Sequence, residues 1–190
     1  TSLDLQGNKI SDVGPLNGLT QLTHLSLRNN QISEVSALKG LTQLTSLDLQ
    51  GNKISEVSAL KGLTQLGSLL LHGNQISDVN ALVSALKGTK AVKGLYLGNN
   101  QISDVSALKE LTQLTVVSLG GNKINEVNAL KELKQLIHLY LNGNQINDVN
   151  ALKELRQLTY LELQDNPALT KAQIEELQTA LPKCRITHNA

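Results

Sequence analysis

The sequence predicts an elongated α/β solenoid, in which short parallel strands stack side by side into one sheet. Three observations predict this fold. An asparagine recurs every 22 residues, with a single interval of 26. A Leu-x-Leu pair precedes the asparagine, and this period of two places both leucines on one face of a strand. Aromatic residues make up only 2% of the chain, while apolar residues reach 40%, which suits a thin aliphatic core shared between stacked units.

The units align over 22 positions, numbered here along residues 22–43, LTHLSLRNNQISEVSALKGLTQ. Leucine or valine fills position four, and leucine fills position six. Seven units have Ile at position eleven, Val at position fourteen and Leu at position seventeen. We expect the position-nine asparagines to form a buried structural ladder that hydrogen-bonds adjacent turns, rather than a catalytic or metal-binding row. They are Asn8, Asn30, Asn52, Asn74, Asn100, Asn122, Asn144 and Asn166.

Two polar columns follow each strand. Position thirteen is acidic in seven consecutive units, and position eighteen is mostly Lys. Calcium needs about six to eight converging oxygens, whereas strands about 4.8 Å apart supply one carboxylate per layer. We therefore interpret the acidic column as a solvated outer face and not as a calcium site. Position fifteen is Ser or Asn in most units, which favours it as the N-cap of a short 3₁₀ or helical turn on the convex side.

Unit four contains four extra residues, within the segment NALVSALKGTKAVKG. Asn80 is a residue type that caps helices, Leu82 and Leu86 fall on one helical face, and Gly88 is suited to end a helix. The segment therefore predicts an α-helix over residues 80–88 on the convex side. It is either a variation in loop length or a feature that docks a partner.

The C-terminal segment predicts a cap. Thr170 and Gln173 have capping-box spacing, and Pro182 would stop the helix that follows. Cys184 then falls in a last edge segment, as a buried apolar residue rather than a reactive thiol. Such a cap shields the final apolar layer of a solenoid. The helix would place three aliphatic side chains on one face: Ile174, Leu177 and Leu181.

The chain thus divides into an array of eight units over residues 1–169 and a capping helix with an edge segment over residues 170–190. The array has no N-terminal cap, because the first residues already lie in a strand. We expect the first layer, residues 1–10, to fray or to self-associate.

The pattern LxxLxLxxNxI, over roughly residues 1–169, resembles the leucine-rich-repeat family. QISDVSALKxLTQL is similar to the short repeats of bacterial internalin-type proteins, and the ending NP-x-LT-x-x-QIEELQxALPxC is similar to endings in that family. The resemblance implies a curved right-handed superhelix, with the sheet on its concave face and 3₁₀ or short helical turns on its convex face. It also implies a binding scaffold in a larger protein, either a surface adhesin or the sensor arm of a Roco-type GTPase.

Composition argues against several other classes of protein. The net charge is +1, which does not favour nucleic acid or insertion into a membrane. One cysteine excludes an internal disulfide framework, and His24 and His72 lie roughly 16 Å apart on strand spacings, too far for a shared metal ion. We expect no enzyme, cofactor or metal site. The fragment has no signal or transmembrane segment, and the cytoplasm and the bacterial cell surface both stay open as its location.

Positions three, five and seven of each unit point out of the concave sheet. They carry all three tyrosines and three of the four histidines. Tyrosine suits strands in general, but the other strands have small polar residues at these positions. We predict a protein-binding face, around which Gly94, Gly98, Gly120 and Gly121 leave the floor open. Its residues are Tyr96, Tyr140, Tyr160, His138, Leu70, Val116, His72 and Glu162.

Two alternatives to a protein partner stay open. Tyrosine, histidine and acidic side chains in a groove are also suited to a carbohydrate. Near-identical second and third units are typical of a consensus-like scaffold that has no ligand.

Overall fold

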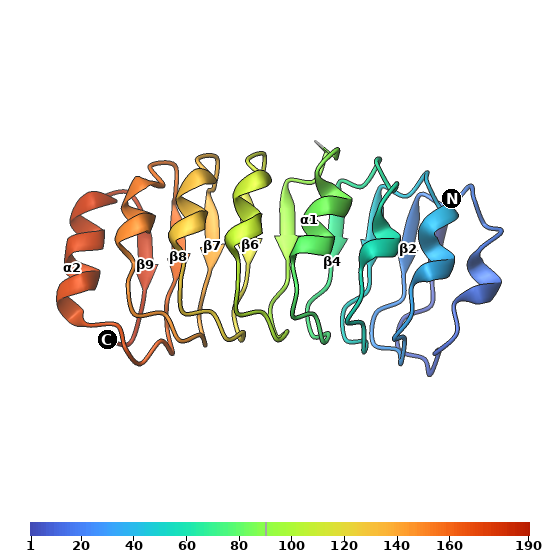
Figure 1. The fold of residues 1–190 in the computed structure, drawn as a ribbon, viewed down its shortest axis with the longest axis horizontal. Coiled ribbons are helices and arrows are strands. Elements are labelled where there is room, and N and C mark those ends of the chain that lie inside the picture. The colour runs from blue at the N-terminus through green and yellow to red at the C-terminus, as the bar shows by residue number, and fades with distance from the viewer. Residues whose placement is uncertain (90) are drawn as a thin grey trace.

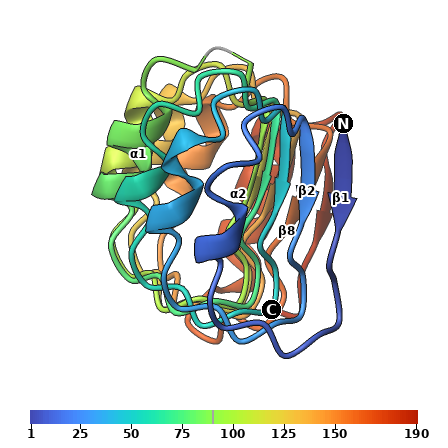
Figure 2. The ribbon, with the colours of Figure 1, turned by 90° about the vertical axis from the view of Figure 1, so that its right-hand side faces the viewer.

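A computed structural model describes residues 1–89 and 91–190 of the chain. Within these residues, nine parallel strands form one sheet in chain order, and the helical turns lie on the opposite side of an elongated molecule (Figures 1 and 2). The strands are β1 Ser2–Asp4, β2 His24–Ser26, β3 Ser46–Asp48, β4 Ser68–Leu70, β5 Gly94–Tyr96, β6 Val116–Ser118, β7 His138–Tyr140, β8 Tyr160–Glu162 and β9 Arg185–Thr187. The 3₁₀ helices are η1 Gly14–Leu16, η2 Ser36–Gly40, η3 Ser58–Leu60, η4 Ser106–Glu110, η5 Asn128–Glu132 and η6 Asn150–Glu154. The α-helices are α1 Asn80–Leu86 and α2 Lys171–Ala180.

The strand register follows the position-four column. Leu47 pairs with Leu69, and Leu69 pairs with Leu95 across the longer unit. The four extra residues therefore leave the sheet undisturbed. The leucine-rich-repeat solenoid predicted from the sequence is confirmed.

The core is a stack of aliphatic layers between the sheet and the helical turns. Position-four and position-six side chains are 0–2% exposed from the second unit to the eighth. Each layer is covered by the layers on either side of it. The buried apolar area that stabilises the fold therefore lies between units.

The position-nine asparagines join successive units. Asn74 accepts a hydrogen bond from the backbone N–H of Ile54 at 3.0 Å. Its amide donates to the carbonyls of Leu49, at 2.9 Å, and Leu71, at 3.1 Å. The same pattern runs from Asn30 to Asn166, so every buried amide in this ladder is satisfied within the protein.

Asn8 is the exception in this column. It is exposed and donates only to the carbonyls of Leu5 and Gln6 in its own turn. The other members also donate to a carbonyl of the unit before them, a bond that Asn8 does not make. The expectation that Asn8 is buried in the ladder is therefore wrong.

Position eight is where each turn leaves the strand, and it adopts positive φ in all eight units. Gly51 has φ +63°, and a side-chain carbon there would lie 2.3 Å from Oδ1 of Asn29. Glycine is thus needed both for the left-handed backbone and for the space that the neighbouring asparagine fills. Asn29, Asn99 and Asp165 adopt the same conformation, since these residue types tolerate it best after glycine.

The convex helix of unit four is present as α1, with seven residues against three to five in the 3₁₀ turns. Its predicted N-terminal capping is wrong. Asn80 is the first helical residue, and the N-cap is Val79, which has no side-chain cap. The helix ends at Leu86, two residues earlier than predicted, with Lys87 as its C-cap and Gly88 directly after it, where a glycine that ends a helix is expected.

Asp78 performs the role that we assigned to Asn80. Its carboxylate accepts the backbone N–H of Asn80 at 2.7 Å. Other position-thirteen aspartates bond position fifteen in the same way, including Asp104 to Ser106. This bond is the main reason why the pKa of Asp104 is lowered. The aspartates of the acidic column therefore hold turns as well as being solvated, and the position-fifteen residues are not caps.

Helix α2 covers the last layer of the core. The side chain of Thr170 accepts from the N–H of Gln173, and the side chain of Gln173 accepts from the N–H of Thr170, so the predicted capping box is confirmed. Leu177, on the inner face of this helix, is fully buried. Cys184 is buried beside it, and this burial raises the pKa of its thiol to about 11.

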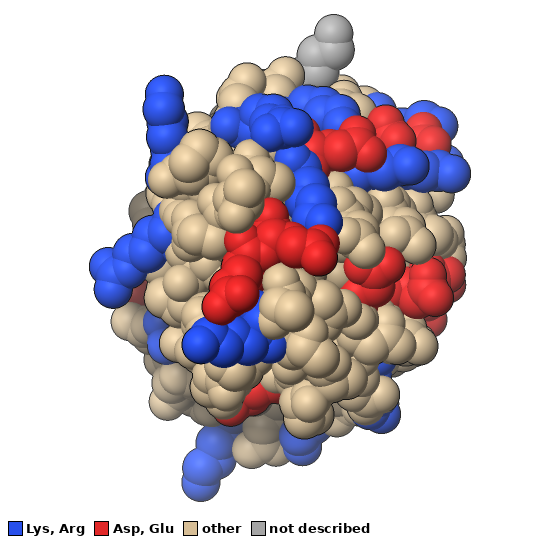
Figure 3. Space-filling model, turned by 90° about the vertical axis from the view of Figure 1, so that its left-hand side faces the viewer, with Lys and Arg blue, Asp and Glu red and all other residues tan. Residues whose placement is uncertain are grey.

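The outer surface at this end is polar. Figure 3 shows basic and acidic side chains interspersed over it. Lys153 forms an ion pair with Glu176 of α2 at 2.8 Å, and Arg156 donates to the carbonyl of Ala180. Across residues 1–89 and 91–190, neither α-helix is long and apolar enough to cross a membrane.

Candidate functional site

The predicted binding residues lie on strands β4 to β8, except His72, which lies two residues after the end of β4. They project from the concave face because the alternate residues of each strand point into the core. Seven are half-buried by their neighbours on the sheet, and His72 is exposed. The structure places them on one face of the sheet but groups only some of them.

His138, Tyr140 and Tyr160 form an aromatic cluster on β7 and β8. The ring centroids of Tyr140 and Tyr160 lie 5.5 Å apart at an interplanar angle of 51°. His138 meets Tyr160 edge-on at 6.4 Å and 74°. Such contacts contribute about 0.5–1.5 kcal/mol beyond the area they bury, so the rings hold one another in place.

Glu162 borders this cluster. It pairs with Tyr140 in the strand register and lies two residues after Tyr160 on the same face of β8. The pKa of Tyr140 is raised, first by burial and then by electrostatic interactions with Tyr160, Glu162 and Tyr96. The cluster therefore combines aromatic faces with one carboxylate.

Tyr96 lies apart from that cluster, and its surroundings differ from our expectation. A side-chain carbon at Gly94 would lie 2.9 Å from Cε2 of Tyr96, which shows that the ring folds back over this glycine. His72 covers Gly98 in the same way. The predicted open floor is therefore wrong, because neighbouring side chains lie flat over the glycines that were expected to leave space.

The remaining predicted residues are spread along the face. Leu70 pairs with Tyr96 in the register, and Val116 pairs with His138. His72 has a different neighbour, since its Nε2 accepts a hydrogen bond from the side-chain amide of Asn99 at 3.0 Å. It belongs to the turn edge of the sheet rather than to the tyrosine cluster.

Sequence reasoning missed two residues of this face. Strand β9 pairs Arg185 with Tyr160 and Thr187 with Glu162. The signal is present in the sequence, because Cys184 and Ile186 alternate with the polar residues Arg185 and Thr187. The residues between and after two inward-facing positions must point outward, so the face extends one strand further than predicted.

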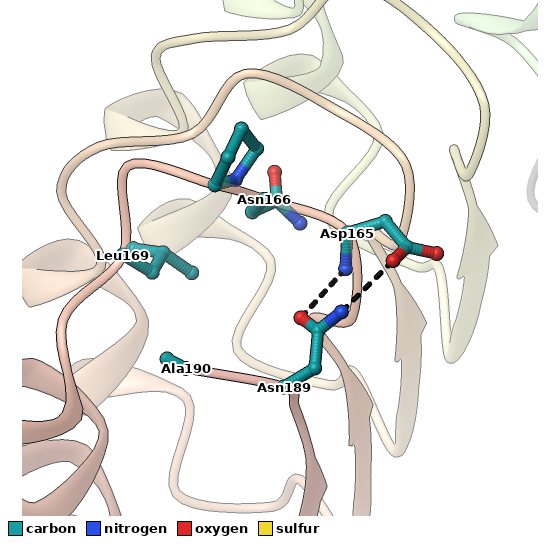
Figure 4. A pocket seen from close by; sticks show the side chains of 6 residues that line it. Asp165, Asn166, Leu169, Asn189 and Ala190 are labelled. Carbon is teal, nitrogen blue, oxygen red and sulfur yellow. Dashed lines mark hydrogen bonds between the residues drawn. The ribbon is translucent and has the colours of Figure 1, made fainter.

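A hollow of about 490 Å³ lies at the C-terminal edge, lined by Asp165, Asn166, Leu169 and Asn189 (Figure 4). There Asn189 accepts the N–H of Asp165 and donates to its carboxylate, each at 2.9 Å. None of the tyrosines lines this hollow.

Residues 1–89 and 91–190 contain no group of three or more His, Cys, Asp or Glu side chains arranged to hold a metal ion.

Comparison with family models gives two matches. Residues 1–40 and 90–132 match a model described as leucine-rich repeats in two copies, and residues 21–76 match a second leucine-rich-repeat model. No curated protein matches the sequence significantly.

Solved structures include similar proteins from two bacteria. An internalin F from Listeria monocytogenes is 32% identical with a TM-score of 0.86, over 100% of this chain and 56% of its own. Internalin C2 of the same species is 30% identical with a TM-score of 0.84, over 99% of this chain and 80% of its own. A leucine-rich-repeat protein of Leptospira interrogans is 28% identical with a TM-score of 0.88, over 98% and 48%. The chain thus spans only about half the length of the first and third of these proteins.

Proposed function

The chain belongs to the leucine-rich-repeat family and has an internalin-like fold, and on this basis we propose that it is a non-catalytic scaffold that binds a partner protein through its concave sheet face. The observation that supports this function most strongly is the location of the tyrosines. The chain has three, and all of them lie on strands β5, β7 and β8 of that face.

The chemistry of these residues favours a protein partner. Tyrosine rings bury large apolar areas and keep a polar hydroxyl, which is why they are frequent among the residues that dominate binding energy. Ile137, which directly precedes β7, is an exposed apolar side chain, at 37%. Because the core leucines lie on the other side of the sheet, the binding residues are largely separate from those that fold the chain.

The test is a triple variant, Tyr96→Ala with Tyr140→Ala and Tyr160→Ala. We expect it to fold with a loss of about 1–2 kcal/mol, since two half-buried rings lose their mutual contact. A matched control changes the same face in units two and three: His24→Ala, Ser46→Ala and Asp48→Ala. Both proteins and the parent chain are immobilised and exposed to a lysate of the source organism, and the captured proteins are identified by mass spectrometry.

The expected result is a protein that the parent and the control capture and that the tyrosine variant does not. Capture of the same protein by all three would place its binding elsewhere and contradict the proposal. A glycan array tests the carbohydrate alternative. Specific glycan binding that Tyr96→Ala abolishes would favour a sugar ligand instead.

A further inference from the structure

Four side chains form a compact block toward the C-terminal end of the proposed face. Strand β7 contributes His138 and Tyr140, and β8 contributes Tyr160 and Glu162, with His138 opposite Tyr160 and Tyr140 opposite Glu162. All four are half-buried. Neighbouring strands lie about 4.8 Å apart, so the carboxylate of Glu162 is attached within one strand spacing of Tyr140.

The charge of Glu162 is not compensated within the described chain. Among residues 1–89 and 91–190, its carboxylate forms no ion pair within 4.0 Å, although Lys87, Lys134, Lys153 and Lys171 each pair with an acidic residue. Arg185 lies on the adjacent strand, opposite Tyr160, and also makes no such pair with it. A half-buried carboxylate beside apolar rings interacts more strongly with a cation than a fully solvated one does.

The pKa of Tyr140 also reflects the charge of Glu162. Besides burial, the pKa of Tyr140 is raised by the negative charge of Glu162 and by electrostatic interactions with Tyr160 and Tyr96. The faces of the two contacting tyrosine rings add their own negative potential. The block therefore favours a positive charge that the described chain does not supply.

We propose that the partner protein places an arginine side chain on this block, with its guanidinium over the Tyr140 and Tyr160 rings and its N–H groups donating to Glu162. The inference rests on the proposed function and names the chemistry of the partner. Arginine fits better than lysine, because its planar guanidinium stacks on aromatic rings and can donate two parallel hydrogen bonds to one carboxylate.

The chain makes this proposal simple to test by NMR, because it has only three tyrosines to assign. The ring signals are followed while an acetylated and amidated pentapeptide, Gly-Gly-Arg-Gly-Gly, is titrated into the protein. The control peptide replaces arginine with citrulline, which keeps the shape and removes the charge. We expect the arginine peptide to shift the Tyr140 and Tyr160 signals at millimolar concentration and the citrulline peptide to shift them at least threefold less.

Two variants test whether binding of the arginine peptide needs the Glu162 carboxylate itself or only a negative charge elsewhere on the face. Glu162→Gln should weaken binding of the arginine peptide at least threefold. Asp48→Asn, at the equivalent position of β3, should leave it unchanged. Equal shifts with both peptides, or unchanged affinity in Glu162→Gln, would overturn the proposal, as would shifts produced by tetramethylammonium chloride alone and not by the arginine peptide.

Failure here and failure of the proposed function give different results. If the triple tyrosine variant loses its partner while the arginine peptide produces no shift, the face binds a protein without this contact. If the peptide binds as expected and the partner is captured by every variant, the contact exists but the partner binds elsewhere.

Discussion

At the C-terminal end of the sheet, helix α2 covers the last aliphatic layer, and Leu163 is 1% exposed. At the N-terminal end, Leu3, Leu5 and Ile10 are only half-buried, and Leu19 is 44% exposed. Both ends have the same Leu-x-Leu pattern and the same strand geometry. The difference teaches that burial in this fold comes from the neighbouring layer and not from the sequence of the unit itself.

The largest expected effect is at the covered end. Leu177→Ala should lower the free energy of unfolding by about 2–5 kcal/mol, since it opens a cavity under α2. Leu19→Ala at the opposite end should lower it by less than about 1 kcal/mol, because much of that side chain is already in water. Chemical denaturation of both variants measures the contrast. Equal losses would mean that the two end layers are sealed to a similar extent.

The asparagine ladder provides a second, smaller contrast. Asn74→Ala should lower the free energy of unfolding by about 1–3 kcal/mol, because it leaves buried backbone groups unsatisfied. Asn8→Ala should lower it by less than about 0.5 kcal/mol, since exposed positions contribute little. Denaturation midpoints with a constant m-value test this. An unchanged midpoint for Asn74→Ala would contradict the structural role of the ladder.

Hydrogen exchange compares the ends without any mutation. The N–H of Leu5 bonds to the carbonyl of Ser26, and that of Leu163 bonds to the carbonyl of Thr187. The two leucines occupy the same position in their units, but Leu5 is the more exposed. We expect the Leu5 amide to exchange at least about tenfold faster, because local opening is easiest where few apolar contacts hold the backbone. Equal rates in a proven monomer would contradict this, and slowing with protein concentration would indicate self-association at the first layer.

The smallest effect concerns the last turn. In other units, the position-eight N–H donates to a backbone carbonyl of the next unit, as Gly143 does to Gln164. Asp165 donates instead to the side chain of Asn189. Asn189→Ala should cost about 0.5–1.5 kcal/mol, the contribution of a typical hydrogen bond, with Asn189→Asp as a variant that keeps the acceptor. A greater loss in Asn189→Asp than in Asn189→Ala would show that repulsion between the new carboxylate and that of Asp165 outweighs the acceptor that is kept.

Most of the fold followed from the sequence, because aligned columns report the same local environment many times. Regular leucines fixed the strands, and the spacing of Thr170 and Gln173 identified the cap. The sequence columns could not decide which residue accepts a hydrogen bond at the start of α1. Asp78 and Asn80 are both residue types that cap helices, and only the backbone geometry decides which of them accepts the N–H.

The side-chain arrangement of the proposed binding face was predicted only in part, for a related reason. Alternation along each strand places Tyr140 and Tyr160 on the same face, but it gives no information on side-chain rotamers. The closure of Tyr96 over Gly94 and of His72 over Gly98 depends on those rotamers. The contact between two tyrosines on adjacent strands likewise required the structure.

The longer fourth unit has a practical consequence for engineering. Its four extra residues are accommodated on the convex side, while Asn100 still accepts the N–H of Ile76 at 2.9 Å and Leu69 still pairs with Leu95. The spacing of side chains on the sheet is therefore independent of the length of the segment behind it. A short tag or a second binding peptide inserted between Lys87 and Gly88 would be displayed on the back of the scaffold without altering the surface in front.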